Sequence, residues 1–200
     1  MPKYLLMLVI SLLMCNLAAQ TASIQESYLA EARGDYQNAL RIMQSLSSGE
    51  PNDTFYQMRK AWLNYLLGSY QEALADYQAA ANKLNHLDAH LGEINCYLAL
   101  GNWDQAKVVA DRLLQVHGQN PSLLSKAAYA LYMKRDYAGA ASYFERIMAI
   151  YPWDFENLGY LVNNLYLAGR VDDARAAYRV LKKYYPQSQI VIDYSSLLDQ

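Results

Sequence analysis

Residues 62–79 read WLNYLLGSYQEALADYQA, and this stretch carries the pattern that decides the fold. Apolar side chains before Gly68 recur at the intervals of an α-helix, and Gly68 ends that helix because glycine adopts the left-handed conformation without strain. Ser69, with a glutamate three residues later, predicts a capping box at the start of a second helix. Ala73 and Tyr77 share one face of this helix, where the small alanine allows another helix to approach closely. The stretch therefore predicts two helices joined by a tight turn.

The same turn recurs along the chain at a fixed interval. A helix-breaking residue is followed five residues later by alanine at Gly34 and Ala39, Gly68 and Ala73, Gly101 and Ala106, Arg135 and Ala140, and Gly169 and Ala174. Successive breakers lie 34, 33, 34 and 34 residues apart. A period of this length is typical of stacked helix–turn–helix units, each of which buries its apolar face only against a neighbour.

Capping residues support the same boundaries. Asp35 and Asp136 each follow a breaker and predict N-caps, while Asn102 with Gln105 predicts a weaker capping box. Asn120, which is followed by proline, predicts the start of another helix. These signals fix where most of the helices should begin.

These residues resemble the tetratricopeptide repeat, whose signature places a small residue and an aromatic residue in the first helix and alanine, an aromatic residue and proline after it. The matching residues are Gly101, Asn102, Trp103 and Ala106, then Asp136, Tyr137, Ala140, Phe144 and Pro152, and finally Gly169, Ala174, Tyr178 and Pro186. The resemblance covers residues 20–186 and implies an all-α, right-handed α-solenoid of about five helix–turn–helix repeats with a C-terminal capping helix. Arg135 departs from the pattern, which expects glycine, as do Asn85 and Gly118, where proline is expected.

The chain is expected to divide into a signal peptide at residues 1–19 and a solenoid domain at residues 20–200. The repeats are expected at approximately 20–53, 54–86, 87–120, 121–154 and 155–188, with the capping helix at 189–200.

The first 19 residues have the features of a secretory signal. Lys3 gives a positive start, the run from Leu5 to Met14 is apolar, and small residues near Ala19 suit cleavage after that residue. The apolar run is shorter than the roughly 20 residues that a membrane span needs. A buried N-terminal helix is one alternative, and lipidation at Cys15 is another, because the preceding residues resemble a bacterial lipobox. The expected location is periplasmic or secreted, or membrane-anchored if Cys15 is lipidated.

Composition excludes several classes of function. The chain has 17 basic and 19 acidic residues without a basic stripe, and phosphate binding needs concentrated lysine and arginine, so nucleic acid is not an expected partner. The sequence contains no glycine-rich phosphate loop, serine nucleophile motif or paired carboxylates, so no enzyme activity and no cofactor are expected. Cys96 is expected to be a small core residue. His86 and His90 are expected to form a surface pair rather than a metal site.

The resemblance also implies where a partner would bind, because the first helices of such repeats line a concave groove. The residues that this phase assigns to partner binding are Tyr28, Met58, Trp62, Tyr65, Asn95, Tyr129, Tyr132, Asn163 and Tyr166, and the same phase adds Glu31, Leu91, Leu98, Ser125, Met133 and Leu167. Aromatic side chains offer rigid contact area, and asparagine pairs with a peptide backbone. Packing between repeats would produce the same stripe, so the tyrosine face is either groove or core.

The sequence thus predicts a protein–protein interaction scaffold or assembly factor of the cell envelope, which binds a partner segment in an aromatic and amide-rich groove. An accessory glycan- or peptide-binding module of the envelope is the alternative, because tyrosine faces also stack on sugar rings. The cationic clamp with which some repeats of this family grip a C-terminal carboxylate is missing. The fifth position of the units reads Ile24, Met58, Leu91, Ser125 and Gly159 instead.

Overall fold

The computed structural model describes residues 23–199, so the predicted signal peptide and Cys15 lie outside the described residues. Residues 23–199 form helices and no strand. The helices are α2 (Ile24–Ala32), α3 (Tyr36–Ser47), α4 (Thr54–Leu66), α5 (Tyr70–Leu84), α6 (Leu87–Ala99), α7 (Trp103–His117), α8 (Pro121–Met133), α9 (Tyr137–Met148), α10 (Phe155–Leu167), α11 (Val171–Tyr184) and α12 (Gln189–Leu198). In this part of the chain no helix has both the length and the apolar character needed to cross a membrane.

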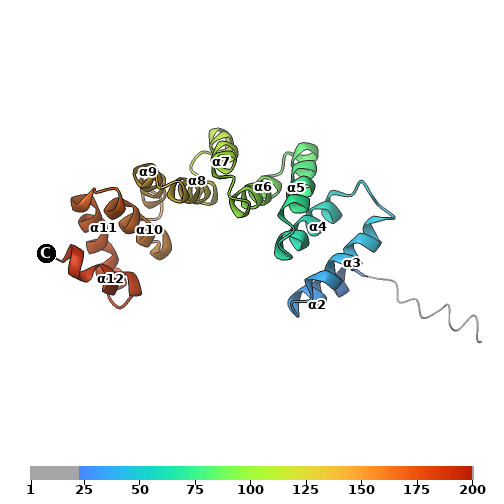
Figure 1. Cartoon of the computed structure of the whole chain (residues 1–200), viewed down its shortest axis with the longest axis horizontal. Helices are drawn as coiled ribbons and strands as arrows, with labels where there is room; N and C mark the ends of the chain where they lie inside the picture. Colours follow the sequence, from blue (N-terminus) through green and yellow to red (C-terminus); the bar gives the residue numbers. More distant parts are fainter. Residues whose placement is uncertain (1–22, 200) are drawn as a thin grey trace, which may run out of the picture.

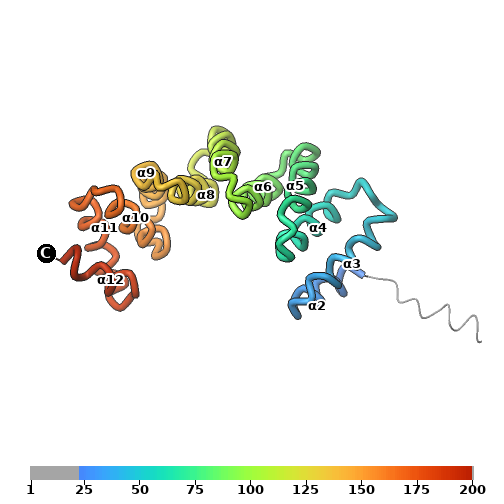
Figure 2. Tube along the Cα trace, viewed as in Figure 1, coloured from blue at the N-terminus to red at the C-terminus, as the bar shows by residue number. Residues whose placement is uncertain are grey.

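The helices form an arch with α2 at one end and α12 at the other (Figures 1 and 2). Each helix packs mainly against its neighbours in the sequence, so the pairs from α2 and α3 to α10 and α11 stack in chain order. First helices such as α4 and α6 lie toward the inner side of the arch, and second helices such as α5 and α7 lie toward its outer side (Figure 1). This arrangement confirms the all-α solenoid predicted from the period.

The alanines of the repeat are fully buried. Ala39, Ala73, Ala106, Ala140 and Ala174 are each 0% exposed. In the second, fourth and fifth units a buried aromatic ring follows on the same helix face, four residues after the alanine. A larger side chain in place of any of these alanines would push neighbouring helices apart, so the alanines set how closely the helices approach.

Glycine has the same role at one position on α6. A Cβ atom placed on Gly92 would lie 2.4–2.5 Å from ring carbons of Tyr77 on α5. Such distances are well inside van der Waals contact, so the ring fits against α6 only because Gly92 has no side chain. Tyr77 is itself buried, and burial raises the pKa of its hydroxyl above the usual value.

Replacing Gly92 with alanine tests this packing. We expect Gly92→Ala to lower the free energy of unfolding by about 1–3 kcal/mol, the usual cost of overpacking a core. This loss should occur although alanine is a better helix former than glycine by about 1 kcal/mol. Urea denaturation followed by circular dichroism measures the difference. In a Tyr77→Leu background the same substitution should cost less, because the ring is gone, and an unchanged cost there would show that the ring is not the obstacle.

The breakers end the first helices in the left-handed conformation. Gly34, Gly68, Gly101 and Gly169 have φ values between 74° and 79°, and Arg135 has a φ of 63°. Only glycine adopts this conformation without a steric cost, so the turn at Arg135 is strained. Arg135 thus replaces the expected glycine, but the backbone of this turn keeps the left-handed conformation of the other turns.

Two of the predicted caps are wrong. The side chains of Ser69 and Asn102 make no capping hydrogen bond, whereas Asp35 and Asp136 accept the backbone N–H three residues later at 3.3 Å and 2.9 Å, as predicted. Backbone geometry does not distinguish these residues, since ψ is 63° and 60° at Ser69 and Asn102 and 63° and 73° at Asp35 and Asp136. The two residues that do cap carry a charged carboxylate, which is a stronger acceptor for the N–H groups at a helix start than a hydroxyl or an amide.

Helix α12 covers the C-terminal end of the arch. Its Val191 and Leu198 are buried, and the Tyr178 hydroxyl of α11 donates to the Val191 carbonyl oxygen at 3.2 Å. A Cβ atom on Gly159 of α10 would lie 3.3 Å from Cδ1 of Ile190, so the absence of a side chain there lets α12 pack closely. The helix thereby shields apolar surface that the last repeat would expose.

Candidate functional site

The nine residues predicted to bind a partner all lie on first helices, and none is fully buried. Tyr28 and Tyr129 are 46% exposed, and Trp62 and Tyr132 are 37% exposed. The other five are half-buried, namely Met58, Tyr65, Asn95, Asn163 and Tyr166. Their accessibility keeps them available to a partner, and their role in binding stays a prediction.

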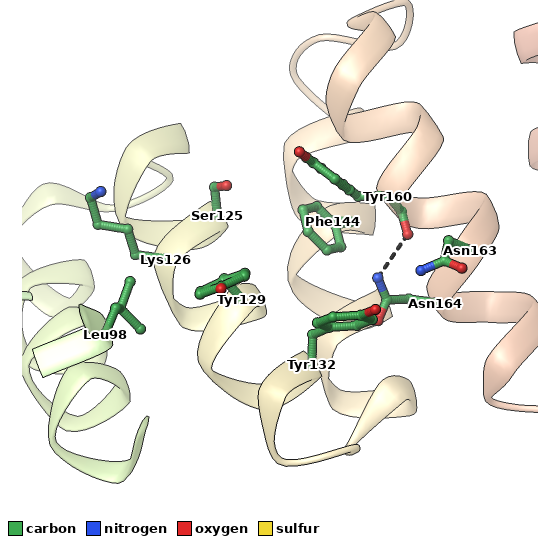
Figure 3. Close-up of a pocket in the computed structure, with 9 residues that line it drawn as sticks. All are labelled: Leu98, Ser125, Lys126, Tyr129, Tyr132, Phe144, Tyr160, Asn163 and Asn164. Atoms are coloured by element: carbon green, nitrogen blue, oxygen red, sulfur yellow. Dashed lines mark hydrogen bonds between the residues drawn. The ribbon is translucent and has the colours of Figure 1, made fainter. Parts of the chain in front are cut away.

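A pocket of about 360 Å³ opens between α8 and α10 (Figure 3). It is lined by Leu98 of α6, by Ser125, Lys126, Tyr129 and Tyr132 of α8, by Phe144 of α9 and by Tyr160, Asn163 and Asn164 of α10. Helix α6 packs against both α4 and α8, but α8 and α10 make no comparable contact. The first helices thus separate between the fourth and fifth repeats, and the buried ring of Phe144 on α9 is reached from the inner face.

The positions that the repeat pattern assigns to the groove include part of this pocket. Tyr129, Tyr132 and Asn163 were assigned to partner binding, and Leu98 and Ser125 were placed in the groove, and all five line the pocket. The phase missed four other lining residues, Lys126, Phe144, Tyr160 and Asn164. Lys126 and Tyr160 occupy the sixth position of their units, immediately after the fifth position that was considered. Counting the sixth position as facing the groove would have identified both.

Polar groups around the pocket are only partly paired. The Lys126 amine donates to Oδ1 of Asn95, and the Tyr194 hydroxyl donates to Oδ1 of Asn163 at 2.6 Å. Asn164, which is 2% exposed, donates from Nδ2 to the Tyr160 carbonyl oxygen at 2.8 Å, and its Oδ1 has no hydrogen-bond partner in residues 23–199. Burial raises the pKa of Tyr194 and lowers the pKa of Lys126. The pocket therefore combines aromatic walls with polar groups that can still bind a ligand.

At the N-terminal part of the concave face, side chains of α2 and α4 form hydrogen bonds with one another. The Glu31 carboxylate accepts hydrogen bonds from Nη2 of Arg59 at 2.6 Å and from Nε1 of Trp62 at 2.7 Å. The guanidinium group of Arg59 lies 4.0 Å from the centre of the Tyr28 ring. Trp62 also stacks on Tyr65 with ring centres 6.0 Å apart. These contacts hold the exposed aromatic rings of α2 and α4 in fixed positions.

The expected surface pair of histidines is wrong for His90. His86 is exposed at the start of α6, but His90 is 8% exposed and its Nδ1 lies 3.1 Å from the Glu93 carboxylate. Its Nε2 lies 3.4 Å from Oδ1 of Asn85. His86 lies just before α6, whereas His90 lies within this helix on its buried face. The two histidines therefore do not share one helix face. In residues 23–199 no group of three or more histidine, cysteine or acidic side chains is suited to hold a metal ion.

Cys96 is a core residue, as predicted. Its side chain is 0% exposed on α6, packed with the buried Ala61, Ala73 and Tyr77. Burial, followed by the nearby Glu93 carboxylate, raises the pKa of its thiol to about 12. A thiol in this environment is a poor nucleophile, because the reactive form is the thiolate.

Comparison with known families identifies the repeat. Two family models described as tetratricopeptide repeat match residues 24–86, 64–128 and 131–193. The chain belongs to the tetratricopeptide repeat family. Tetratricopeptide repeat domains generally bind other proteins, and the fold of this chain suggests a protein–protein interaction scaffold.

Relatives share parts of this repeat array. The chain is 25% identical over 152 residues to Protein CTR9 homolog of Arabidopsis thaliana, a match that covers 74% of this chain and only 14% of that protein. A tetratricopeptide repeat protein from Parabacteroides merdae has a TM-score of 0.74 and 18% identity, covering 85% of this chain and 68% of that chain. YrrB, described as a TPR protein with an unusual peptide-binding site, has a TM-score of 0.68 and 11% identity, covering 87% and 90%. At these identities the structural likeness shows the fold alone.

The contacts of Glu31 yield a stability prediction for this tetratricopeptide repeat protein. We expect Glu31→Gln to lower the free energy of unfolding by about 1–2 kcal/mol, because the largely buried Arg59 loses its charged partner. Urea denaturation measures the loss, and tryptophan emission should shift because Trp62 donates to the same carboxylate.

The matched control is Asp172→Asn on α11. Asp172 pairs with Arg175, but its side chain is 98% exposed, so the same chemical change should cost no more than the few tenths of a kcal/mol that a charge at the start of a helix contributes. Equal losses in the two variants would contradict a special role for the Glu31 contacts.

Proposed function

We propose that this protein is an interaction scaffold whose concave face binds an extended segment of another protein, with the pocket between α8 and α10 as the main contact. The observation that carries the proposal is the pocket itself. It exposes the rings of Tyr129, Tyr132 and Tyr160 beside the amide of Asn163, in a volume of about 360 Å³. Aromatic walls with a few polar groups are the usual composition of a specific binding pocket.

The peptide-binding reading is supported by the polar groups that line the pocket. An extended peptide carries a backbone N–H and carbonyl oxygen at every residue, and amide side chains pair with both. The half-buried amide of Asn163 and the exposed hydroxyl-bearing rings of Tyr129 and Tyr132 supply such groups. YrrB, which shares the fold, is described as having a peptide-binding site, and the same use of the fold is proposed here.

A displayed library of random peptides, selected on the immobilised full-length protein, tests this function. We expect wild type to enrich a family of related peptides and the Tyr129→Ala, Tyr132→Ala double variant to bind them at least tenfold more weakly, since each ring contributes on the order of 1 kcal/mol of contact. Circular dichroism should show both proteins folded, because these side chains are exposed.

The matched control is the Tyr151→Ala, Trp153→Ala double variant. Both residues are aromatic, at 50% and 62% exposure, but they lie in the turn between α9 and α10 and do not line the pocket. Peptide affinity should be unchanged in this variant. Equal losses in the two double variants, or no enriched peptide on wild type, would overturn the proposal. If no peptide is enriched but the immobilised protein retains cell-wall glycan fragments, the accessory glycan-binding alternative is favoured.

The site of action is proposed to be the cell envelope. This proposal rests on the sequence of residues 1–19, with its apolar run and small residues before Ala19. Intact mass spectrometry of the protein purified from the envelope fraction tests it. Export predicts a chain that begins at Gln20, whereas a chain that begins at a lipid-modified Cys15 would replace the soluble form by an anchored one. A full-length chain found in the cytoplasm would refute export.

A further inference from the structure

Two nitrogen donors, the Asn163 amide and the Lys126 amine, belong to residues that line the pocket between α8 and α10. Oδ1 of Asn163 accepts the Tyr194 hydroxyl, and Figure 3 shows the nitrogen of the same amide on the pocket side. The hydroxyls of Tyr129 and Tyr132, which form no hydrogen bond within residues 23–199, can donate or accept. Lys126 adds an amine on the α6 side of the pocket, the side on which Leu98 lies (Figure 3). A ligand that brings acceptor oxygens therefore complements this pocket better than one that brings donors.

Lys126 is a cation without a carboxylate partner. The ion pairs of the described residues use the cations of Arg59, Lys107, Lys134, Arg170, Arg175 and Lys182 and the imidazoles of His86 and His90. Lys126 has only the neutral oxygen of Asn95. Burial lowers the pKa of its amine, because the protonated form loses part of its hydration. A carboxylate beside the amine would offset that loss with a charge-assisted hydrogen bond.

We infer that the pocket binds an acidic side chain of the partner segment, aspartate or glutamate, with its carboxylate at Lys126 and a neighbouring aromatic or large aliphatic side chain between Tyr129 and Tyr160. The inference rests on the proposed function, since it names the chemistry of the segment that the concave face would hold. Charge complementarity selects the acid, and the rings of α8 and α10 select the apolar neighbour.

The acid is assigned to a side chain and not to the end of the partner chain. The concave face continues past the pocket in both directions, to the exposed Trp62 and Tyr28 on α4 and α2 and to the half-buried Tyr194 on α12. A segment that follows this face passes through the pocket, so the group at Lys126 comes from within the segment. The face gives no reason for the chain to end there.

Peptides displayed as internal segments have no free C-terminal carboxylate and therefore test the side-chain assignment directly. The random-peptide library is selected on full-length wild type and on full-length Lys126→Met, which keeps the apolar stem and removes the charge. We expect wild type to select peptides with aspartate or glutamate at a fixed position next to an aromatic or large aliphatic residue. The Lys126→Met selection should lose the acidic residue and keep the apolar one.

Calorimetric titration then measures one selected peptide and its Glu→Gln (or Asp→Asn) counterpart. On wild type the acidic form should bind about tenfold more tightly, with a preference that falls as salt rises, and on Lys126→Met the two forms should bind equally. Lys183→Met is the matched control, because Lys183 lies on α11 over the Tyr184 ring and does not line the pocket. It should retain the full preference, and Lys126→Arg should restore it in the pocket.

The outcomes separate this inference from the proposed function. If wild-type binding depends on Tyr129 and Tyr132 but shows no acidic preference, the scaffold function stands and the role of Lys126 is wrong. A preference that survives in Lys126→Met overturns the inference as well. If only synthetic peptides with a free C-terminal carboxylate bind, and their amidated forms do not, the assignment to a side chain is wrong. Failure to select any peptide overturns both proposals together.

Discussion

The whole arch depends on the close packing of helices at small residues, alanine and glycine. The repeat alanines are completely buried, and Gly92 accepts the Tyr77 ring where even a methyl group would collide. Since each helix packs mainly against its neighbours in the chain, these short approaches set the rotation from one helix to the next. The direction of the first helices, and hence the shape of the concave face, follows from the size of a few side chains, most of which lie on the second helices.

The repeat architecture could be predicted because its determinants are local. Gly34 and Ala39, like their counterparts in later units, act within a few residues of their own position, so the sequence carries the turn and the close contact together. Capping was harder to predict, because Ser69 and Asp35 both follow a left-handed glycine with the same backbone geometry, and only the charged Asp35 side chain accepts the cap hydrogen bond. His90 was misplaced for a related reason, since its burial depends on Glu93 and Asn85 and not on its spacing from His86.

The pocket could be predicted only in part. Tyr129, Tyr132 and Asn163 follow from the phase of the repeat, which assigns a face to each position. The opening itself lies where α8 and α10 contact each other less than α6 and α8 do, a property of how two units stack that no single unit encodes. Lys126 lines the pocket from the sixth position of α8, with its amine turned toward Asn95 of α6, and the phase rule does not count this position as facing the groove.

The two halves of the concave face differ in how their polar groups are used. Around α2 and α4 the Glu31 carboxylate is shared between Arg59 and Trp62, and these residues fix the aromatic rings beside them. Around α8 and α10 several donors remain available, and Asn164 keeps an acceptor without a partner. The surface around α2 and α4 is therefore rigid. The polar groups around α8 and α10 would lose water on binding, and a ligand that pairs with them would be preferred over one that does not.

The burial of Cys96 gives the folded array a chemical reporter. Among residues 23–199 it is the only cysteine, it lies in the core beside Tyr77, and its raised thiol pKa slows attack on any alkylating reagent. Alkylation at this position requires α6 to separate from α5, so its rate, measured by peptide mapping, reports how often the centre of the arch opens under native conditions.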